Sequence, residues 1–233
     1  MKAIRTKISA YAIALLLGCG LSTSANAGSS DFSGIYGAMW ASAGGAQIDG
    51  SHTDRDGQST HGQVGGVFPL AGYEIGFNLP LGDVLFLGVG HSVTQGGTAS
   101  IARGDGDVKG GSNSDGNAAG DSSFNLTATD LKSVYIMPSV SAFDNSAIYV
   151  KIGRSIADLS LTGSATGAPT NLQGDILGMG TIAMTPSGLF VRTEGSVTRF
   201  NDIYITGVGN SPSALVEGTP DVVQGTVSVG FKF

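Results

Sequence analysis

Three histidines and one neighbouring serine come nearest to a catalytic group in this 233-residue chain. His52 and His61 lie in a polar segment, and His91 is followed directly by Ser92. A hydrolase needs the imidazole to take the proton of a hydroxyl, so both must lie on one face. Adjacent strand residues point to opposite faces, which separates His91 from Ser92, and His91 from Thr94 likewise. The sequence therefore predicts no catalytic residue and no enzyme, and a lipid-modifying enzyme is the least favoured alternative.

Acidic residues cluster in one Gly-rich stretch, at Asp105, Asp107, Asp115 and Asp121. Carboxylate oxygens suit a hard divalent cation, but no Asp-initiated loop here has a Glu at its twelfth position. The stretch also contains Arg103-Gly104-Asp105, a weak match to the tripeptide that integrins bind. A solvated loop is the favoured interpretation. We therefore predict no metal site and no cofactor.

Four further charged residues lie in segments whose polarity alternates: Glu74, Lys151, Arg192 and Glu194. If these segments are strands, the period of two places all four on the polar faces, away from the apolar side chains. Opposite charges on converging faces would form a salt-bridged interior cluster. The favoured interpretation is that they satisfy one another in a narrow lumen, and a transport or gating role is the alternative.

The alternation is clearest at the C-terminus. There Val227, Val229, Phe231 and Phe233 share one face, and polar residues or glycine occupy the other. Eight segments are candidate strands: 32–42, 72–79, 85–93, 129–140, 147–160, 173–184, 188–203 and 221–233. Such segments are long enough to cross a bilayer as tilted strands, which takes about 9 to 11 residues.

The connections between these segments alternate in length. Three are tight turns, 78–83, 142–146 and 185–188, and four are long and polar, 43–66, 95–128, 161–172 and 204–220. Short turns on one side and long loops on the other are typical of outer-membrane barrels. The pattern predicts an all-β fold: a closed antiparallel transmembrane β-barrel of about eight strands.

Closure has a physical reason, because backbone groups find no water in hydrocarbon and an open sheet edge would leave them unpaired. Apolar side chains then face lipid and polar ones face the lumen.

Arg154 breaks this pattern, because Ile152 and Ile156 share its face. A bulge that shifts the phase and a position near the headgroups are both open. A soluble exported barrel or sandwich is the rival fold, since alternation does not say what the apolar face meets.

Residues 1–27 have the three parts of a secretory signal: a basic start, an apolar stretch at 10–17 and small residues at the cleavage site. We expect cleavage between Ala27 and Gly28, which leaves residues 28–233 as one barrel domain. Lipoprotein processing at Cys19, the only cysteine, is the alternative.

The charge balance excludes one class of partner. The chain carries 12 basic and 18 acidic residues, a net charge of −6. The predicted signal holds three of the basic residues and no acidic one, so its removal brings the net charge to −9. Phosphate binding in nucleic acids needs a basic footprint, so we predict no nucleic-acid partner.

Three stretches carry a resemblance to a known family: 72–89 with its strand, turn and strand, 149–153, and the closing 229–233. Together they resemble the opacity-type outer-membrane β-barrel family, which is similar to the small OmpA and OmpX barrels. In that family the terminal aromatic strand is read by the barrel assembly machinery. The resemblance therefore gives Phe231 and Phe233 the role of the assembly signal and implies outer-membrane lipids as surroundings.

The expected function follows from this layout. We expect a structural or surface-exposed protein of the bacterial outer membrane whose long loops contact the environment or a host ligand. The alternative is a small pore for ions or small solutes, although eight strands leave a narrow path or none. Aromatic residues would mark the membrane interfaces, and the candidates are Trp40, Tyr73, Tyr135, Tyr149 and Tyr204.

Overall fold

The computed structural model describes residues 28–53, 59–95, 99–104, 124–143, 145–163, 170–206 and 215–233. Its elements, in chain order, are α2 (Ser29–Phe32), β1 (Gly34–Thr53), β2 (Ser59–Pro80), β3 (Leu85–Thr94), β4 (Ala99–Gly104), β5 (Phe124–Phe143), β6 (Ser146–Gly163), β7 (Asn171–Met184), β8 (Leu189–Phe200), β9 (Ile203–Thr206) and β10 (Leu215–Lys232). Among these residues no helix is long and apolar enough to cross a membrane.

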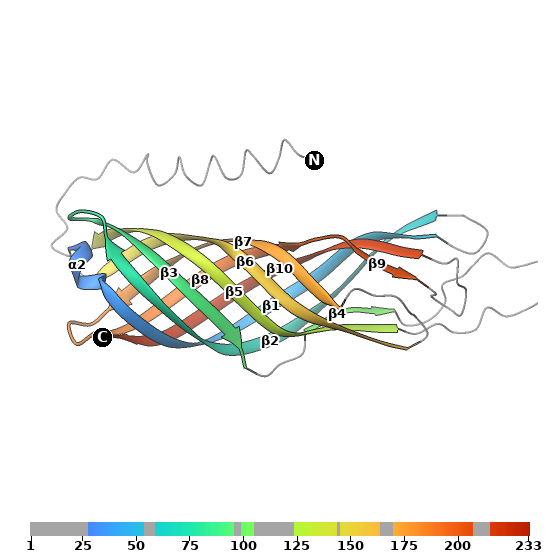
Figure 1. Ribbon diagram of the computed structural model, residues 1–233, viewed down its shortest axis with the longest axis horizontal. Coiled ribbons are helices and arrows are strands. Elements are labelled where there is room, and N and C mark those ends of the chain that lie inside the picture. The colour runs from blue at the N-terminus through green and yellow to red at the C-terminus, as the bar shows by residue number, and fades with distance from the viewer. Residues whose placement is uncertain are drawn as a thin grey trace, which may run out of the picture.

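Eight of the strands close into a barrel (Figure 1). Each pairs antiparallel with its neighbour in the order β1, β2, β3, β5, β6, β7, β8, β10, and β10 pairs back onto β1. The two short strands continue the wall of this ring: β4 pairs with the start of β5 on the edge that β3 also uses, and β9 pairs with the start of β10 on the edge that β8 also uses. The predicted closed antiparallel barrel of eight strands is confirmed.

The register fixes how far the strands tilt. Directly paired residues run from Gly37 through Ile75, His91, Val134, Arg154, Asp175, Arg199 and Asp221 to Gln47. One circuit therefore returns to β1 at position 47 rather than 37, a displacement of ten residues. With a strand spacing of about 4.8 Å and a rise of about 3.3 Å per residue, this shear gives a tilt of about 40°. Each pairing row thus climbs the barrel as it goes round.

Several strands extend beyond the predicted ones. β1 continues to Thr53 and β2 begins at Ser59, so most of the predicted loop 43–66 is paired strand. The other predicted loops are also shorter than expected, because β4 and the start of β5 lie in 95–128, and β9 and the start of β10 lie in 204–220. Predicted strand 188–203 divides at residues 201 and 202, and the tight turn at 185–188 is confirmed.

The sequence pattern does not reveal these extensions because polarity changes along the barrel wall, as β8 shows. On β8 the outward side chains are apolar at Leu189, Val191 and Val197, and then charged at Arg199. The inward side chains change in the opposite sense, from Arg192 to Phe200. The phase is unbroken, since inward and outward residues alternate throughout β8. The half of the barrel far from α2, called the second half here, has polar residues outside and apolar ones inside. A prediction that assumes apolar residues outside does not recognise this pattern.

This second half has its own core. It contains ten buried apolar residues: Ala46, Ile48, Phe68, Leu70, Ala157, Leu172, Phe200, Ile203, Ile205 and Val222. The prediction of a polar lumen is therefore wrong here. Apolar side chains turn inward where the outer face carries polar groups, as in a water-soluble barrel.

The opposite end of the barrel is closed by α2, which Figure 1 places beside the C-terminus. The predicted first strand 32–42 begins two residues later, at Gly34, because residues 29–32 form a single helical turn. Phe32 is 1% exposed and its ring stacks on Phe86 of β3 at 5.0 Å between centroids. Asn78 Nδ2 of β2 donates to the Phe32 carbonyl at 2.9 Å, and Lys232 Nζ of β10 donates to the Asp31 carbonyl at 2.7 Å. The turn therefore ties β10 to β2 and β3 across the mouth.

Phe32→Ala should lower the free energy of unfolding by roughly 3 kcal/mol, because it removes a fully buried ring and leaves a cavity. Urea titration in detergent micelles measures this loss. Ser30→Ala is the matched control, since Ser30 is exposed in the same turn and its change should stay within about 0.5 kcal/mol. Equal losses for the two variants would show that the turn does not seal the mouth.

Candidate functional site

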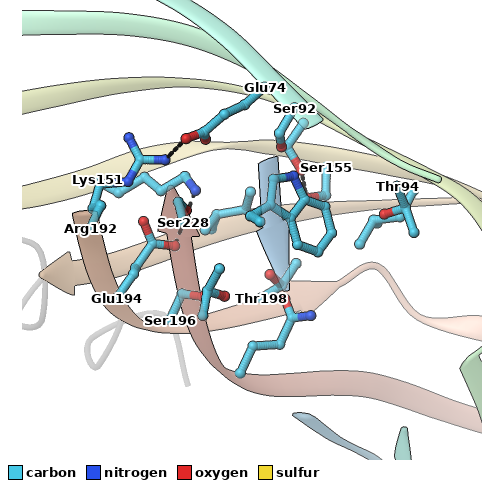
Figure 2. A pocket seen from close by; sticks show the side chains of 16 residues that line it. Glu74, Ser92, Thr94, Lys151, Ser155, Arg192, Glu194, Ser196, Thr198 and Ser228 are labelled. Carbon is cyan, nitrogen blue, oxygen red and sulfur yellow. Dashed lines mark hydrogen bonds and ion pairs between the residues drawn. The ribbon is translucent and has the colours of Figure 1, made fainter. Parts of the chain in front are cut away.

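Four charged side chains converge inside the barrel (Figure 2). Glu74 comes from β2, Lys151 from β6, and Arg192 and Glu194 from β8. Arg192 and Glu194 lie two residues apart and therefore share the inward face. All four are at least nine-tenths buried. The structure thus brings together every residue of the cluster that the alternation placed on polar faces.

The four charges form two separate ion pairs. Lys151 Nζ lies 3.0 Å from Glu194 Oε1, and Arg192 Nη2 binds Glu74 Oε1. The Arg192 and Glu74 side chains are only 3% and 2% exposed. Charges so far from water are tolerated only when they are paired and hydrogen-bonded, and leaving one partner alone is costly.

Two tyrosines complete the hydrogen bonding of the carboxylates. Tyr135 donates to Glu74 Oε2 at 2.8 Å, and Tyr149 donates to Glu194 Oε2 at 3.0 Å. Each carboxylate therefore has a partner on both oxygens. In addition, Lys151 Nζ lies 4.3 Å from the centroid of the Tyr135 ring, a cation–π contact.

These tyrosines correct a prediction. Tyr135 and Tyr149 were expected at the membrane interfaces, but they are 3% and 0% exposed in the lumen, while Tyr73 and Tyr204 do face outward. Trp40 also turns inward and lines the central cavity. The inward direction of Tyr149 could have been predicted from the sequence, since Tyr149 lies two residues from Lys151 and therefore shares its face.

Glycines make room for the inward aromatic rings. Tyr36 is paired directly with Gly76, and Tyr149 with Gly180. A Cβ at Gly76 would lie 2.4 Å from the Tyr36 ring, and one at Gly180 would lie 2.6 Å from the Tyr149 hydroxyl. The rings lie flat over the neighbouring strand, which is how large side chains fit a lumen of eight strands.

A small polar cavity of about 40 Å³ lies beside the ion pairs. Its lining is rich in hydroxyls, from Ser92, Thr94, Ser133, Ser155, Ser196, Thr198, Thr226 and Ser228, most of them labelled in Figure 2. Trp40 Nε1 and Thr94 Oγ1 are buried without a protein partner. The space suits two or three water molecules, which would satisfy these groups.

Apolar layers lie on both sides of this polar zone. The inward face of β8 reads Phe190, Arg192, Glu194, Ser196, Thr198, Phe200, all buried. Phe190 belongs to a cluster that includes Phe32, Tyr36 and Met137, and Phe200 belongs to the core of the second half. The charged centre is therefore enclosed between two packed layers.

The remaining candidate residues are not brought together. His91 is exposed on the outer face, with Nδ1 3.0 Å from the Ser133 carbonyl, whereas Ser92 lines the inner cavity. His61 is exposed, and the side chain of His52 lies outside the described part of the chain. Within the described ranges, no group of three or more His, Cys, Asp or Glu side chains is placed to hold a metal.

Other candidates fall beyond the described residues. These are the acidic cluster Asp105, Asp107, Asp115 and Asp121, and the predicted signal 1–27 with Cys19. The aromatic pair at the C-terminus is described: Phe231 and Phe233 face outward, 43% and 78% exposed, and their rings meet edge to face at 5.4 Å. Phe231 lies on β10 beside the seam that β10 forms with β1, and Phe233 directly follows the end of that strand.

Comparison with known proteins gives structural likeness only. No family model matches the chain, and no curated protein matches it. Among solved structures, the outer membrane protein OprG from Pseudomonas aeruginosa aligns with a TM-score of 0.50 and 12% identity, over 86% of this chain and 96% of OprG. At that identity the likeness shows a shared fold, that of an outer-membrane β-barrel.

Two further structures align over 86% of this chain. The outer membrane protease OmpT from Escherichia coli has a TM-score of 0.46 and 10% identity, over 97% of its length. Ail, the attachment invasion locus protein of Yersinia pestis, solved with a heparin analogue, has a TM-score of 0.40 and 8% identity, over 99% of its length.

Glu74→Gln should lower the free energy of unfolding by about 3 to 5 kcal/mol, because Arg192 would remain buried without its counter-charge. The double variant Glu74→Gln with Arg192→Met removes both charges and should recover most of that loss. Urea titrations of the wild type, both single variants and the double variant measure the coupling. Additive losses would mean that the pair contributes no interaction of its own.

Proposed function

We propose that this protein is a closed anchor in the bacterial outer membrane that holds a rigid β-structure on the cell surface. The observation that carries the proposal is the change of polarity halfway along the strands. Apolar side chains face outward from the end that bears α2, and polar side chains face outward beyond Arg199 and Asp221. An outer face with an apolar band and a polar extension fits a barrel half in lipid and half in water.

The strand lengths support the same proposal. β1 and β2 contain 20 and 22 residues, whereas a tilted strand crosses the hydrocarbon in about 9 to 11. The extra residues remain hydrogen-bonded to each other and enclose the second apolar core. The extracellular half would therefore be a packed body that presents its loops to the environment or to a host ligand.

The enclosed charges favour this role over a pore. Arg192 and Glu194 lie between Phe190 and Phe200 on one strand, and α2 covers the mouth. A conducting path would need to open both apolar layers. A permeating ion would also lose its water beside the two buried ion pairs. The enzyme alternative has no observation in its favour among the described residues, where His91 and Ser92 face opposite ways.

We further propose membership of the opacity-type barrels, with export by the signal 1–27 and insertion by the barrel assembly machinery. The outward exposure of Phe231 and Phe233 at the end of the closing strand supports their use as the assembly signal. Outer-membrane lipids are then the partners of the apolar band.

Single cysteines test the placement in the membrane. Met39 and Gln47 lie on the outward face of β1, within and beyond the apolar band respectively. A membrane-impermeant maleimide on intact cells should label Gln47→Cys and leave Met39→Cys unlabelled, because lipid covers the latter. Cleavage of the predicted signal would remove Cys19 as background. Labelling of both sites would contradict the lipid-facing band.

Conductance separates the anchor from the pore. The purified protein in a planar bilayer should give no discrete openings. The variant Lys151→Ala with Arg192→Ala should also be silent, because the apolar layers around Phe190 and Phe200 remain. Openings in the wild type that change with this double substitution would establish a pore lined by the interior charges.

A further inference from the structure

The outward-facing basic side chains gather on one side of the barrel. Lys132 on β5, Arg154 on β6 and Arg199 on β8 are all exposed. The other lysine and arginine side chains that the structure describes lie elsewhere: Lys151 and Arg192 in the lumen, and Lys232 against α2. In a chain with net negative charge, this gathering of cations needs a reason of its own.

A ladder of alternating charge crosses four neighbouring strands at this place. Arg154, Asp175, Arg199 and Asp221 occupy directly paired positions on β6, β7, β8 and β10. Arg154 Nε lies 3.2 Å from Asp175 Oδ1, and Arg199 Nη2 lies 2.6 Å from Asp221 Oδ2. Lys132 joins the ladder from β5, where its partner Ile156 is two residues beyond Arg154.

The arginines keep donors free for a ligand. A guanidinium has five N–H groups in a planar fork. Arg154 gives Asp175 a hydrogen bond from Nε, and Arg199 binds Asp221 through Nε and Nη2. Both side chains remain more than half exposed, at 65% and 54%. The aspartates therefore hold the guanidinium groups in place without using all their donors.

On β8 and β10 the ladder lies where the outward face changes from apolar to polar. On β8, Val197 precedes Arg199 and exposed Asn201 follows it; on β10, exposed Val223 lies on the apolar side of Asp221. On β6 the change comes one outward residue later, after the exposed Ile156, so Arg154 faces outward at the margin of the apolar band and is paired there with Asp175. No phase shift is needed to explain it, because its pairing with Val134 on β5 is regular.

The other side of the barrel differs. On β1, β2 and β3 the described exposed residues near this level include no lysine or arginine: β1 has Gln47 and the acidic Asp49, β2 has Val67, and Gln95 follows β3. A general preference of interfaces for charge would act all round the barrel. The one-sided ladder instead favours a specific contact.

We propose that Lys132, Arg154 and Arg199 bind the phosphate groups of a phosphorylated glycolipid in the outer leaflet. This proposal rests on the outer-membrane placement proposed above. Arginine suits phosphate because its fork donates two parallel, charge-assisted hydrogen bonds, and lysine adds a point charge. A headgroup that lies at the apolar boundary reaches the ladder laterally while its acyl chains cover the apolar face below.

The level of the site favours a lipid over a soluble anion. Apolar side chains such as Ile152 lie directly beside the basic groups on the same outer face, 38% exposed. A ligand with phosphate and hydrocarbon parts satisfies both surfaces, whereas free phosphate satisfies only the charges. Screening by salt would also reduce the affinity of these basic groups most strongly for a small, exposed anion.

The test uses protein purified in detergent micelles, with a fluorophore on Gln173→Cys, which neighbours Asp175 on the outer face. The probes are lipid A with two phosphates, the same lipid without phosphates, phosphatidylglycerol and inorganic phosphate. The triple variant Lys132→Gln, Arg154→Gln and Arg199→Gln should bind bisphosphorylated lipid A about a hundredfold more weakly, given about a factor of five for each of the three basic residues near charged lipid. Its affinity for the dephosphorylated lipid should not change.

The matched control is Arg154→Lys with Arg199→Lys, which keeps the charge and should retain affinity within about threefold of the wild type. Wild-type affinity in the triple Gln variant, or equal binding of the two forms of lipid A, would overturn the phosphate site. Equal binding of phosphatidylglycerol would replace the glycolipid with anionic lipid in general, and tight binding of inorganic phosphate would overturn the lipid assignment. If Gln47→Cys is labelled and Met39→Cys is not, a negative binding result contradicts only the glycolipid site and leaves the proposed membrane anchor in place.

Discussion

Closure of the backbone hydrogen bonds between β1 and β10 is the constraint on which the rest of the structure depends. In hydrocarbon no water is present to satisfy an open edge, so eight strands must meet in a ring. The ring closes with a displacement from Gly37 to Gln47, and that shear sets the tilt and the narrow lumen. It also decides which residues of distant strands come to the same height inside the barrel.

The narrow lumen explains the chemistry at its centre. Two carboxylates and two cations share it because each charge has a counter-charge and each carboxylate has a tyrosine donor, as for Glu74 with Arg192 and Tyr135. Glycines on neighbouring strands, such as Gly180 opposite Tyr149, leave space for the rings. The centre is thus a polar network in which removal of one charged member leaves another buried without its counter-charge.

The barrel is long because, in the proposed arrangement, one half of its wall lies in lipid and the other half in water. In the half proposed to lie in lipid, apolar side chains such as Val191 point outward, and the lumen holds the charged centre next to the apolar layer around Phe190. Where water surrounds the wall, the order reverses and residues such as Phe200 form an inner core. The boundary between these halves is the level of the Arg199 and Asp221 pair. The same reversal that stiffens the outer half therefore also locates the headgroup region proposed as a glycolipid site.

The sequence alone determined the all-β class, nearly the whole of β3, β6, β7 and β8, and one part of β1, β2, β5 and β10. It also determined the inward face of Glu74, Lys151, Arg192 and Glu194, because side-chain direction follows the period of two within each strand. It did not reveal the paired segments of β1 and β2 within residues 43–66, because their outward residues are polar and their composition is that of a loop. The partner of each charge, the inward turn of Tyr135 and the ladder from Arg154 to Asp221 were decided only by the tertiary structure. These depend on register and shear, which bring residues far apart in the chain to one level and leave no trace in any single segment.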